Sequence, residues 1–161
     1  MVVLIPMLLQ SDDNKEMIYH TFLFDENIWM ARGVYIDGQG KYHSVAGQSV
    51  ITHATDQWIN DSAMHLEGNP AVEFRNRYEI EPMERNQEMT TWRSENPALG
   101  RMSGRFIIVD DSILSVFASA DGVFQGTEYL RLIDDDLYWN RGSLLQGDKK
   151  ASSWALELRR K

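Results

Sequence analysis

Arginine and aromatic side chains are interleaved along the sequence, at spacings that could bring them together inside a fold. Arginine presents a planar fork of donors that fits a carboxylate or a phosphate, and tryptophan and tyrosine offer flat apolar area to a ring or chain. Such a mixture would hold a small amphipathic or anionic organic molecule. The residues are Arg32, Tyr35, Arg75, Arg77, Tyr78, Trp92, Arg105, Tyr129, Arg131, Trp139 and Arg141.

A subset of these residues forms the predicted ligand-binding set, although alternation alone does not say which strand faces point inward. The alternative is that half or more of them face outward, in cross-strand ion pairs with glutamates. The predicted set is Arg32, Tyr35, Arg77, Trp92, Arg105, Tyr129, Arg131 and Arg141. The glutamates of the alternative are Glu73, Glu79, Glu128 and Glu157.

Signatures of catalysis and of metal binding are missing from the sequence. His20, His43, His53 and His65 show neither an i, i+4 pair nor a neighbouring cysteine, and the acidic run at residues 134–136 lacks the spacing of a calcium loop. No Gly-x-Ser-x-Gly elbow is present. We therefore predict no catalytic residue and no metal site, and the sequence identifies no cofactor.

Composition indicates an ordinary globular protein and limits its partners. The 161 residues are 43% hydrophobic and 25% charged, and 24 acidic against 16 basic side chains give a formal net charge of -8. This charge repels phosphate backbones and anionic lipid surfaces, so we predict neither a nucleic-acid nor a membrane partner. A homodimer is a weaker expectation, which would have to use side-chain patches because a barrel leaves no free sheet edge.

The absence of cysteine favours the cytoplasm, because it removes any disulfide framework. The apolar stretch at residues 1–9 keeps a secreted or periplasmic location open as the alternative. That stretch lacks a positively charged start and a small-residue cleavage site, and Pro6 interrupts it.

Turn residues recur at short intervals from Trp29 onward, which leaves little room for helices. The segments between the turns are suited to about ten short strands, a pattern typical of an up-and-down barrel or a sandwich. Mixed polar and apolar faces favour the barrel, because a tightly packed sandwich would show cleaner alternation. The expected strands are residues 28–36, 41–53, 58–66, 72–82, 88–93, 101–109, 113–118, 123–133, 137–141 and 151–159.

The N-terminal segment, residues 1–27, carries a helix signal. Asp13 and Glu16 have the spacing of a capping box, which predicts a short helix over about residues 14–24. The alternative is that residues 17–24 already form a strand, since they are rich in aromatic and β-branched side chains. We expect one domain over residues 1–161, with the barrel in residues 28–161.

Several strand patterns resemble the closing strands of calycin barrels, nearest to the fatty-acid-binding-like barrels that include the S-type phycobilin lyases and related bacterial domains. The resemblance implies a calycin-like fold in which Trp29 packs under a basic residue from the last strand. It does not extend to the Gly-x-Trp triplet of lipocalins or to the carboxylate-gripping Arg-x-Tyr pair of fatty-acid-binding proteins. The patterns are GRFIIVDD at residues 104–111, GTEYL at 126–130, LYWNRG at 137–142 and SSWALELR at 152–159.

Three functions from different classes follow from this sequence. The leading expectation is a carrier or binding barrel for a small amphipathic or anionic organic ligand. The resemblance implies the second, a chromophore-attaching chaperone or an enzyme that acts inside the cavity. The third is a structural or partner-binding module whose interior is filled by side chains. Whether the protein is an enzyme stays open, with a non-enzyme favoured.

Overall fold

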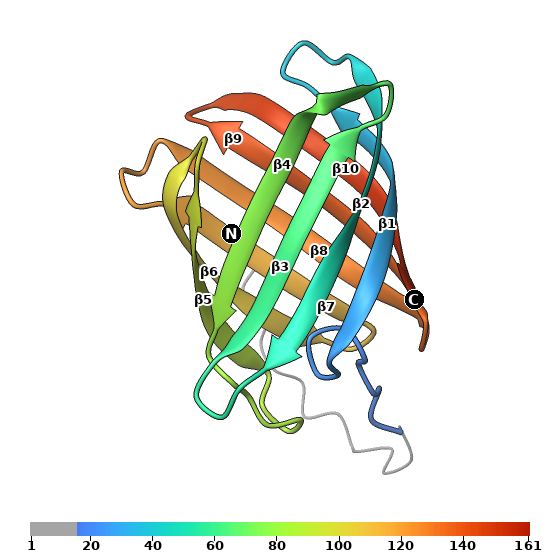
Figure 1. Ribbon diagram of the computed structural model, residues 1–161. Coiled ribbons are helices and arrows are strands. Elements are labelled where there is room, and N and C mark those ends of the chain that lie inside the picture. Colours follow the sequence, from blue (N-terminus) through green and yellow to red (C-terminus); the bar gives the residue numbers. More distant parts are fainter. Residues whose placement is uncertain (1–15) are drawn as a thin grey trace, which may run out of the picture.

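The strands close into one antiparallel barrel in which neighbours in the sequence are neighbours in space, and β1 closes the barrel on β10 (Figure 1). The computed structural model describes residues 16–161. The strands are β1 (Asn27–Ile36), β2 (Tyr42–His53), β3 (Trp58–Leu66), β4 (Asn69–Ile80), β5 (Met89–Asn96), β6 (Gly100–Val109), β7 (Ser112–Ser119), β8 (Phe124–Asp134), β9 (Leu137–Gln146) and β10 (Lys149–Arg160). The prediction of an all-β, up-and-down barrel of about ten strands is confirmed.

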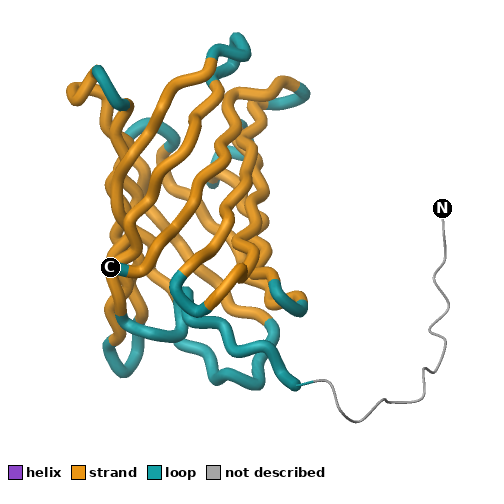
Figure 2. Tube along the Cα trace, turned by 90° about the vertical axis from the view of Figure 1, so that its right-hand side faces the viewer, coloured by secondary structure: helices purple, strands orange, loops and turns teal. Residues whose placement is uncertain are grey.

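The predicted helix at residues 14–24 is wrong for the part that the structure describes. Residues 16–26 contain neither a helix nor a strand and run across one end of the barrel (Figure 2). The backbone N–H groups of Thr21 and Phe22, which a helix would bond to its own carbonyls, donate instead to the hydroxyl of Tyr138 on β9. Asp13, the proposed cap, lies outside the described residues.

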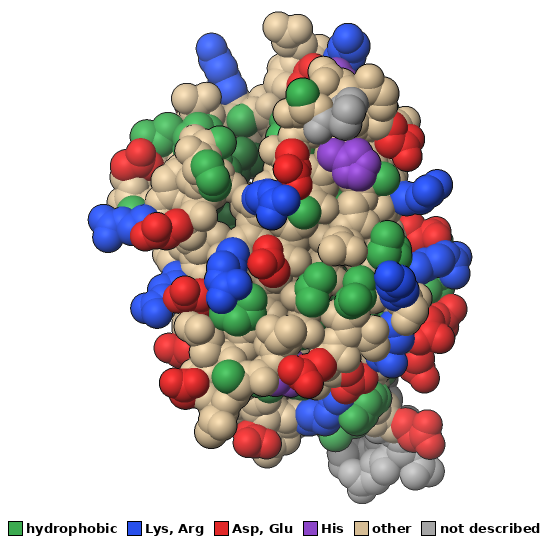
Figure 3. Space-filling model, in the orientation of Figure 1, with side chains coloured by type: hydrophobic (Ala, Val, Ile, Leu, Met, Phe, Trp, Pro, Cys, Tyr) green, Lys and Arg blue, Asp and Glu red, His purple; other side chains and the backbone are tan. Residues whose placement is uncertain are grey.

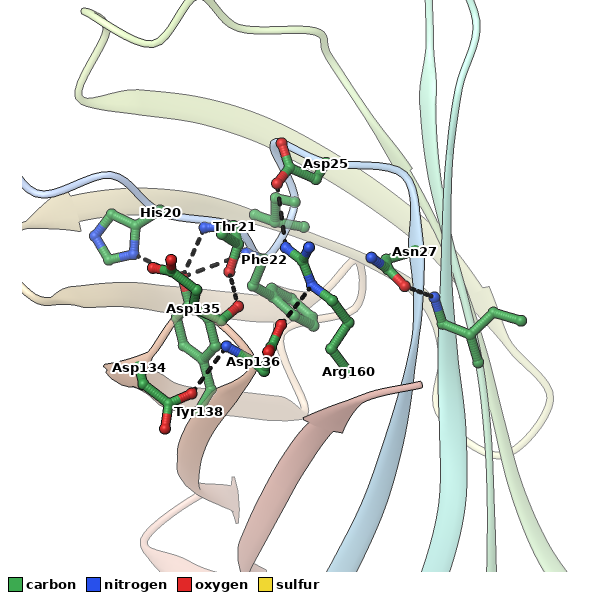
Figure 4. A network of polar contacts seen from close by, with 12 residues as sticks. His20, Thr21, Phe22, Asp25, Asn27, Asp134, Asp135, Asp136, Tyr138 and Arg160 are labelled. Atoms are coloured by element: carbon green, nitrogen blue, oxygen red, sulfur yellow. Dashed lines mark hydrogen bonds and ion pairs between the residues drawn. The ribbon is translucent and has the colours of Figure 1, made fainter.

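The Tyr138 hydroxyl fastens this crossing segment, residues 16–26, to the barrel (Figure 4). It accepts hydrogen bonds from the backbone N of Thr21 at 3.0 Å and of Phe22 at 3.3 Å, and it lies 3.1 Å from His20 Nδ1. Its single proton therefore goes to His20 Nδ1, which leaves the imidazole proton on Nε2 to be donated to the Asp110 carbonyl at 2.9 Å. One hydroxyl thus satisfies three groups from residues 20–22.

The core lies against this closed end of the barrel. Trp29 is fully buried, and its ring lies 5.5 Å from those of Phe22 and Tyr138. Arg160 of β10 places its guanidinium carbon 5.5 Å from the Trp29 ring and pairs with Asp25 at 3.2 Å. The implied packing of Trp29 under a basic residue of the last strand is confirmed.

The His20 ring makes the closed end sensitive to mild acid. Burial lowers the pKa of His20 below 6.5, and this outweighs the hydrogen bond to the Asp110 carbonyl. The unfolded chain therefore takes up a proton at a higher pH than the folded protein does, so stability falls as the pH drops below about 6.5. Glutamine does not take up a proton in this range, so His20→Gln lacks this acid-dependent loss of stability. We expect the difference in unfolding free energy between wild type and His20→Gln to shrink from pH 7 to pH 5 in urea titrations. A difference that stays constant from pH 7 to pH 5 would show that protonation of His20 does not destabilise the fold.

No helix in residues 16–161 is long and apolar enough to cross a membrane. On the face seen in Figure 3, acidic and basic side chains are interspersed over the outer wall of the barrel. Of the glutamates assigned to cross-strand ion pairs, Glu79 makes one, with Arg93 of β5 at 2.7 Å. Glu73 and Glu157 pair within their own strands instead, with Arg75 at 3.0 Å and with Arg159 at 2.7 Å.

Candidate functional site

The barrel encloses a cavity of about 520 Å³. It extends from Phe22 in the crossing segment to residues 97–99 in the β5–β6 turn, and every strand contributes to its wall. The crossing segment closes the lower end of the barrel in Figure 2, whereas the hairpins at the upper end stand apart. The interior is therefore not filled by side chains, unlike the interior of a packed structural module.

Most of the cavity wall is apolar and aromatic, and three aromatic rings are accommodated by glycines on the neighbouring strands. Trp92 lies opposite Gly104 and Trp154 lies opposite Gly142 in the strand register, while Phe117 lies opposite Gly126. A Cβ on Gly142 would lie 2.2 Å from the Trp154 ring, and one on Gly126 would lie 2.3 Å from the Phe117 ring. Glycine at these positions lets the rings lie flat across the next strand.

Glu128 of β8 projects a carboxylate into this apolar wall. Its Oε2 accepts hydrogen bonds from Asn140 Nδ2 at 3.1 Å and from Trp154 Nε1 at 3.3 Å. Asn140 is itself held by a second bond to the Tyr129 carbonyl at 3.1 Å. Burial raises the pKa of the Glu128 carboxyl, and the two hydrogen bonds oppose this shift by stabilising the carboxylate.

A row of polar side chains crosses the cavity wall on β3, β4 and β5. In the strand register Asn60 pairs with Tyr78, and Tyr78 pairs with Ser94. Asn60 Oδ1 and Ser94 Oγ are buried and have no hydrogen-bond partner among the described residues. Burial, together with the nearby charge of Glu128, raises the pKa of the Tyr78 hydroxyl, so this group remains a protonated donor. The row therefore offers unused hydrogen-bonding capacity to the cavity.

Two of the predicted ligand-binding residues line the cavity. Tyr35 lies near its upper end, where its ring centroid is 5.0 Å from that of Phe74. Trp92 lies deeper, packs edge-on against Tyr78 at 4.8 Å, and donates from Nε1 to Ser115 Oγ at 3.3 Å. The structure brings these side chains to one space, and whether they contact a ligand stays a prediction.

The other predicted residues alternate with cavity-lining neighbours and lie on the outer face of the barrel. Arg77 pairs with Asp61 at 3.7 Å and Arg131 with Asp111 at 2.9 Å. Arg141 lies over the exposed Trp139 ring at 5.9 Å. The predicted residues that do not line this cavity are Arg32, Arg77, Arg105, Tyr129, Arg131 and Arg141. Arg105 instead lines a second pocket, formed by residues of β4 to β7 and of the β2–β3 turn.

The interpretation of Glu128 as an outward ion-pair partner is wrong. Glu128 alternates in phase with Leu130, which is buried in the core, whereas Tyr129 on the opposite face is exposed. The sequence contained this alternation, together with Gly126 two residues earlier. The sequence did not show which of the two strand faces points into the barrel, because this depends on the partners Asn140 and Trp154 on other strands.

No group of three or more His, Cys, Asp or Glu side chains within residues 16–161 is arranged to hold a metal ion. His43 and His53 lie at opposite ends of β2, so they do not meet across a hairpin. His43 Nε2 lies 2.9 Å from Asp37 Oδ2, and His53 Nε2 lies 2.7 Å from the Leu23 carbonyl. Both are held by contacts of the fold itself.

The order and closure of the strands define a calycin-like barrel, and solved structures share it. The S-type phycobiliprotein lyase CPES from Guillardia theta matches with a TM-score of 0.63 at 7% identity, covering 85% of this chain and 88% of that one. Rv2717c from M. tuberculosis matches with a TM-score of 0.66 at 10% identity, covering 84% and 92%. No protein-family model and no curated protein matches the sequence. At these identities the likeness establishes the fold.

Proposed function

We propose that this barrel binds a small amphipathic organic molecule inside its cavity. The observation that carries the proposal is a largely apolar cavity of about 520 Å³ whose wall includes two buried polar atoms without a hydrogen-bond partner in residues 16–161, Asn60 Oδ1 and Ser94 Oγ. Such atoms are costly in a folded protein unless water or a ligand pairs with them. Aromatic rings and a few convergent polar groups are the usual composition of a small-molecule site.

A matched pair of substitutions on β10 tests this proposal. Ser152 is buried and lines the cavity, whereas the next residue, Ser153, is on the opposite face of the strand. We expect Ser152→Phe to fill the cavity and abolish the fluorescence increase of Nile red, a neutral dye that brightens in apolar surroundings. Ser153→Phe should leave the increase unchanged. Equal dye binding by both variants and wild type would place the dye elsewhere and count against the proposal.

A chromophore-attaching chaperone is the second candidate, and the fold likeness to a phycobiliprotein lyase supports it. Its distinguishing property is a bound pigment. Protein purified from its source would show visible absorbance that Ser152→Phe abolishes, whereas a colourless sample with a bound small molecule would favour the carrier.

A further inference from the structure

The charge of the cavity wall is carried by acidic rather than basic groups. Among the described residues, the charged side chains that line the cavity are Glu73, Arg75 and Glu128. Glu73 and Arg75 are exposed residues at the start of β4 and pair with each other at 3.0 Å. Glu128 is therefore the acidic group of the interior that has no basic partner, because no lysine, histidine or second arginine of residues 16–161 lines the wall.

The Glu128 carboxylate has one oxygen already positioned and the other available. Both of its hydrogen bonds within the described structure go to Oε2, from Asn140 and Trp154, while a carboxylate can accept about four. A carboxylate enclosed in an apolar wall loses its hydration and is stabilised by a positive charge placed against it. A ligand that brings a protonated nitrogen to Oε1 would supply this charge.

The rest of the polar wall also suits a ligand that donates hydrogen bonds. Among the described residues, Asn60 Oδ1 is a buried acceptor without a hydrogen-bond partner, and the Ser94 hydroxyl, on the other side of Tyr78 in the row, is also unpaired. Aromatic faces attract cations, and Trp92 and Trp154 belong to this wall. An anionic ligand would be repelled by Glu128, and the one arginine of the wall, Arg75, is already paired with Glu73. The Tyr78 and Ser94 hydroxyls of the row can donate to a ligand of either charge, so the preference depends on Glu128.

We infer that the cavity selects organic cations, namely an amphipathic molecule with a protonated amine that pairs with Glu128 and an apolar or aromatic body against the wall. This inference rests on the proposed function, because it names the chemical class that the same cavity takes. It also reverses the charge preference that the arginine-rich sequence pattern predicts.

Three probes with the same aromatic body and different charge test the inference. They are 1-naphthylmethylamine, a cation at neutral pH, 1-naphthylmethanol, which is neutral, and 1-naphthoate, an anion. By calorimetric titration at pH 7 we expect the amine to bind at least about tenfold tighter than the alcohol, or about 1.4 kcal/mol, with the carboxylate weakest. Equal affinities for the amine and the alcohol, or tightest binding of the carboxylate, would overturn the inference.

Glu128→Gln should bring the affinity for the amine down to that for the alcohol and leave the alcohol unaffected. Glutamine keeps a side-chain oxygen that can accept the bonds from Asn140 and Trp154 while removing the charge. The matched control is Glu157→Gln, because Glu157 lies on the outer face and pairs with Arg159. An amine preference that survives Glu128→Gln would refute the role of Glu128. If that variant does not fold, the ranking of the three probes on wild type decides.

The two proposals fail in different ways in this experiment. Binding of the alcohol without a preference for the amine would refute cation selection and leave the binding cavity intact. If none of the probes binds wild type with a Kd below about 1 mM, or about -4 kcal/mol, the binding function fails and cation selection fails with it.

Discussion

Replacing Trp29 with alanine is expected to lower the free energy of unfolding by about 4 kcal/mol, the typical cost of removing a buried tryptophan. Trp29 is completely buried, at 0% exposure, where the crossing segment meets the barrel. The substitution leaves a cavity beneath Phe22 and removes the aromatic face under the Arg160 guanidinium. Because a domain is stable by only about 5–15 kcal/mol, this loss would be visible as a large drop in the urea midpoint.

The matched control is Trp139→Ala. Trp139 lies on the outer face of β9 and is 43% exposed, so its removal should cost less than about 1 kcal/mol. If both variants lower the free energy of unfolding by similar amounts, burial of Trp29 at the closed end does not stabilise the barrel as described.

Tyr138→Phe is expected to cost about 3 kcal/mol although it removes a single oxygen atom. That oxygen serves the backbone N–H groups of Thr21 and Phe22 and the Nδ1 atom of His20. Each buried polar group left without a partner costs about 1–3 kcal/mol, and partial rearrangement of the crossing segment should offset part of the sum. The variant should also exchange the amide hydrogens of Thr21 and Phe22 faster than wild type does.

Tyr129→Phe provides the control for this prediction, because Tyr129 lies on the outer face of β8 and is 39% exposed. It should change the unfolding free energy by less than about 0.5 kcal/mol. If Tyr138→Phe has no larger effect, and the exchange at Thr21 and Phe22 is unchanged, the hydroxyl does not hold the crossing segment.

The strands could be predicted from the sequence because their limits are set by local chemistry. The expected strand at residues 58–66 matches β3, and the others differ from the observed bounds mainly at their ends. Turn signals such as the glycines at positions 40 and 122, which have φ of 81° and 73°, mark the hairpins directly. Strand β9 was expected to end at residue 141 and continues to Gln146. The reason is Gly142, whose place in the strand depends on the Trp154 ring of β10.

The crossing segment could not be predicted, because its contacts come from distant parts of the chain. A capping-box spacing is a local signal and favours a helix start. The structure instead binds residues 20–22 through Asp110, Asp135 and Tyr138, roughly a hundred residues away in sequence. Long-range hydrogen bonds of this kind override a local preference and leave no periodic pattern behind.

The cavity residues were predicted only in part, because alternation defines two faces without orienting them. Arginines were selected for their capacity to bind anions, yet Arg131 and Arg141 lie on the outer face with Asp111 and Trp139. Glu128 was placed on that outer face in the alternative interpretation. A carboxylate inside a barrel is an exception to the usual burial preferences, and it becomes intelligible only once its hydrogen-bond donors are seen.

The central claim is that the cavity carries a small molecule, and native mass spectrometry tests it most directly. Protein purified from its source would be measured in the folded and the denatured state, with Ser152→Phe purified in the same way as a reference. We predict an extra mass on folded wild type that is lost on denaturation and is absent from the variant. A bare mass for folded wild type, equal to its denatured mass, would contradict the claim.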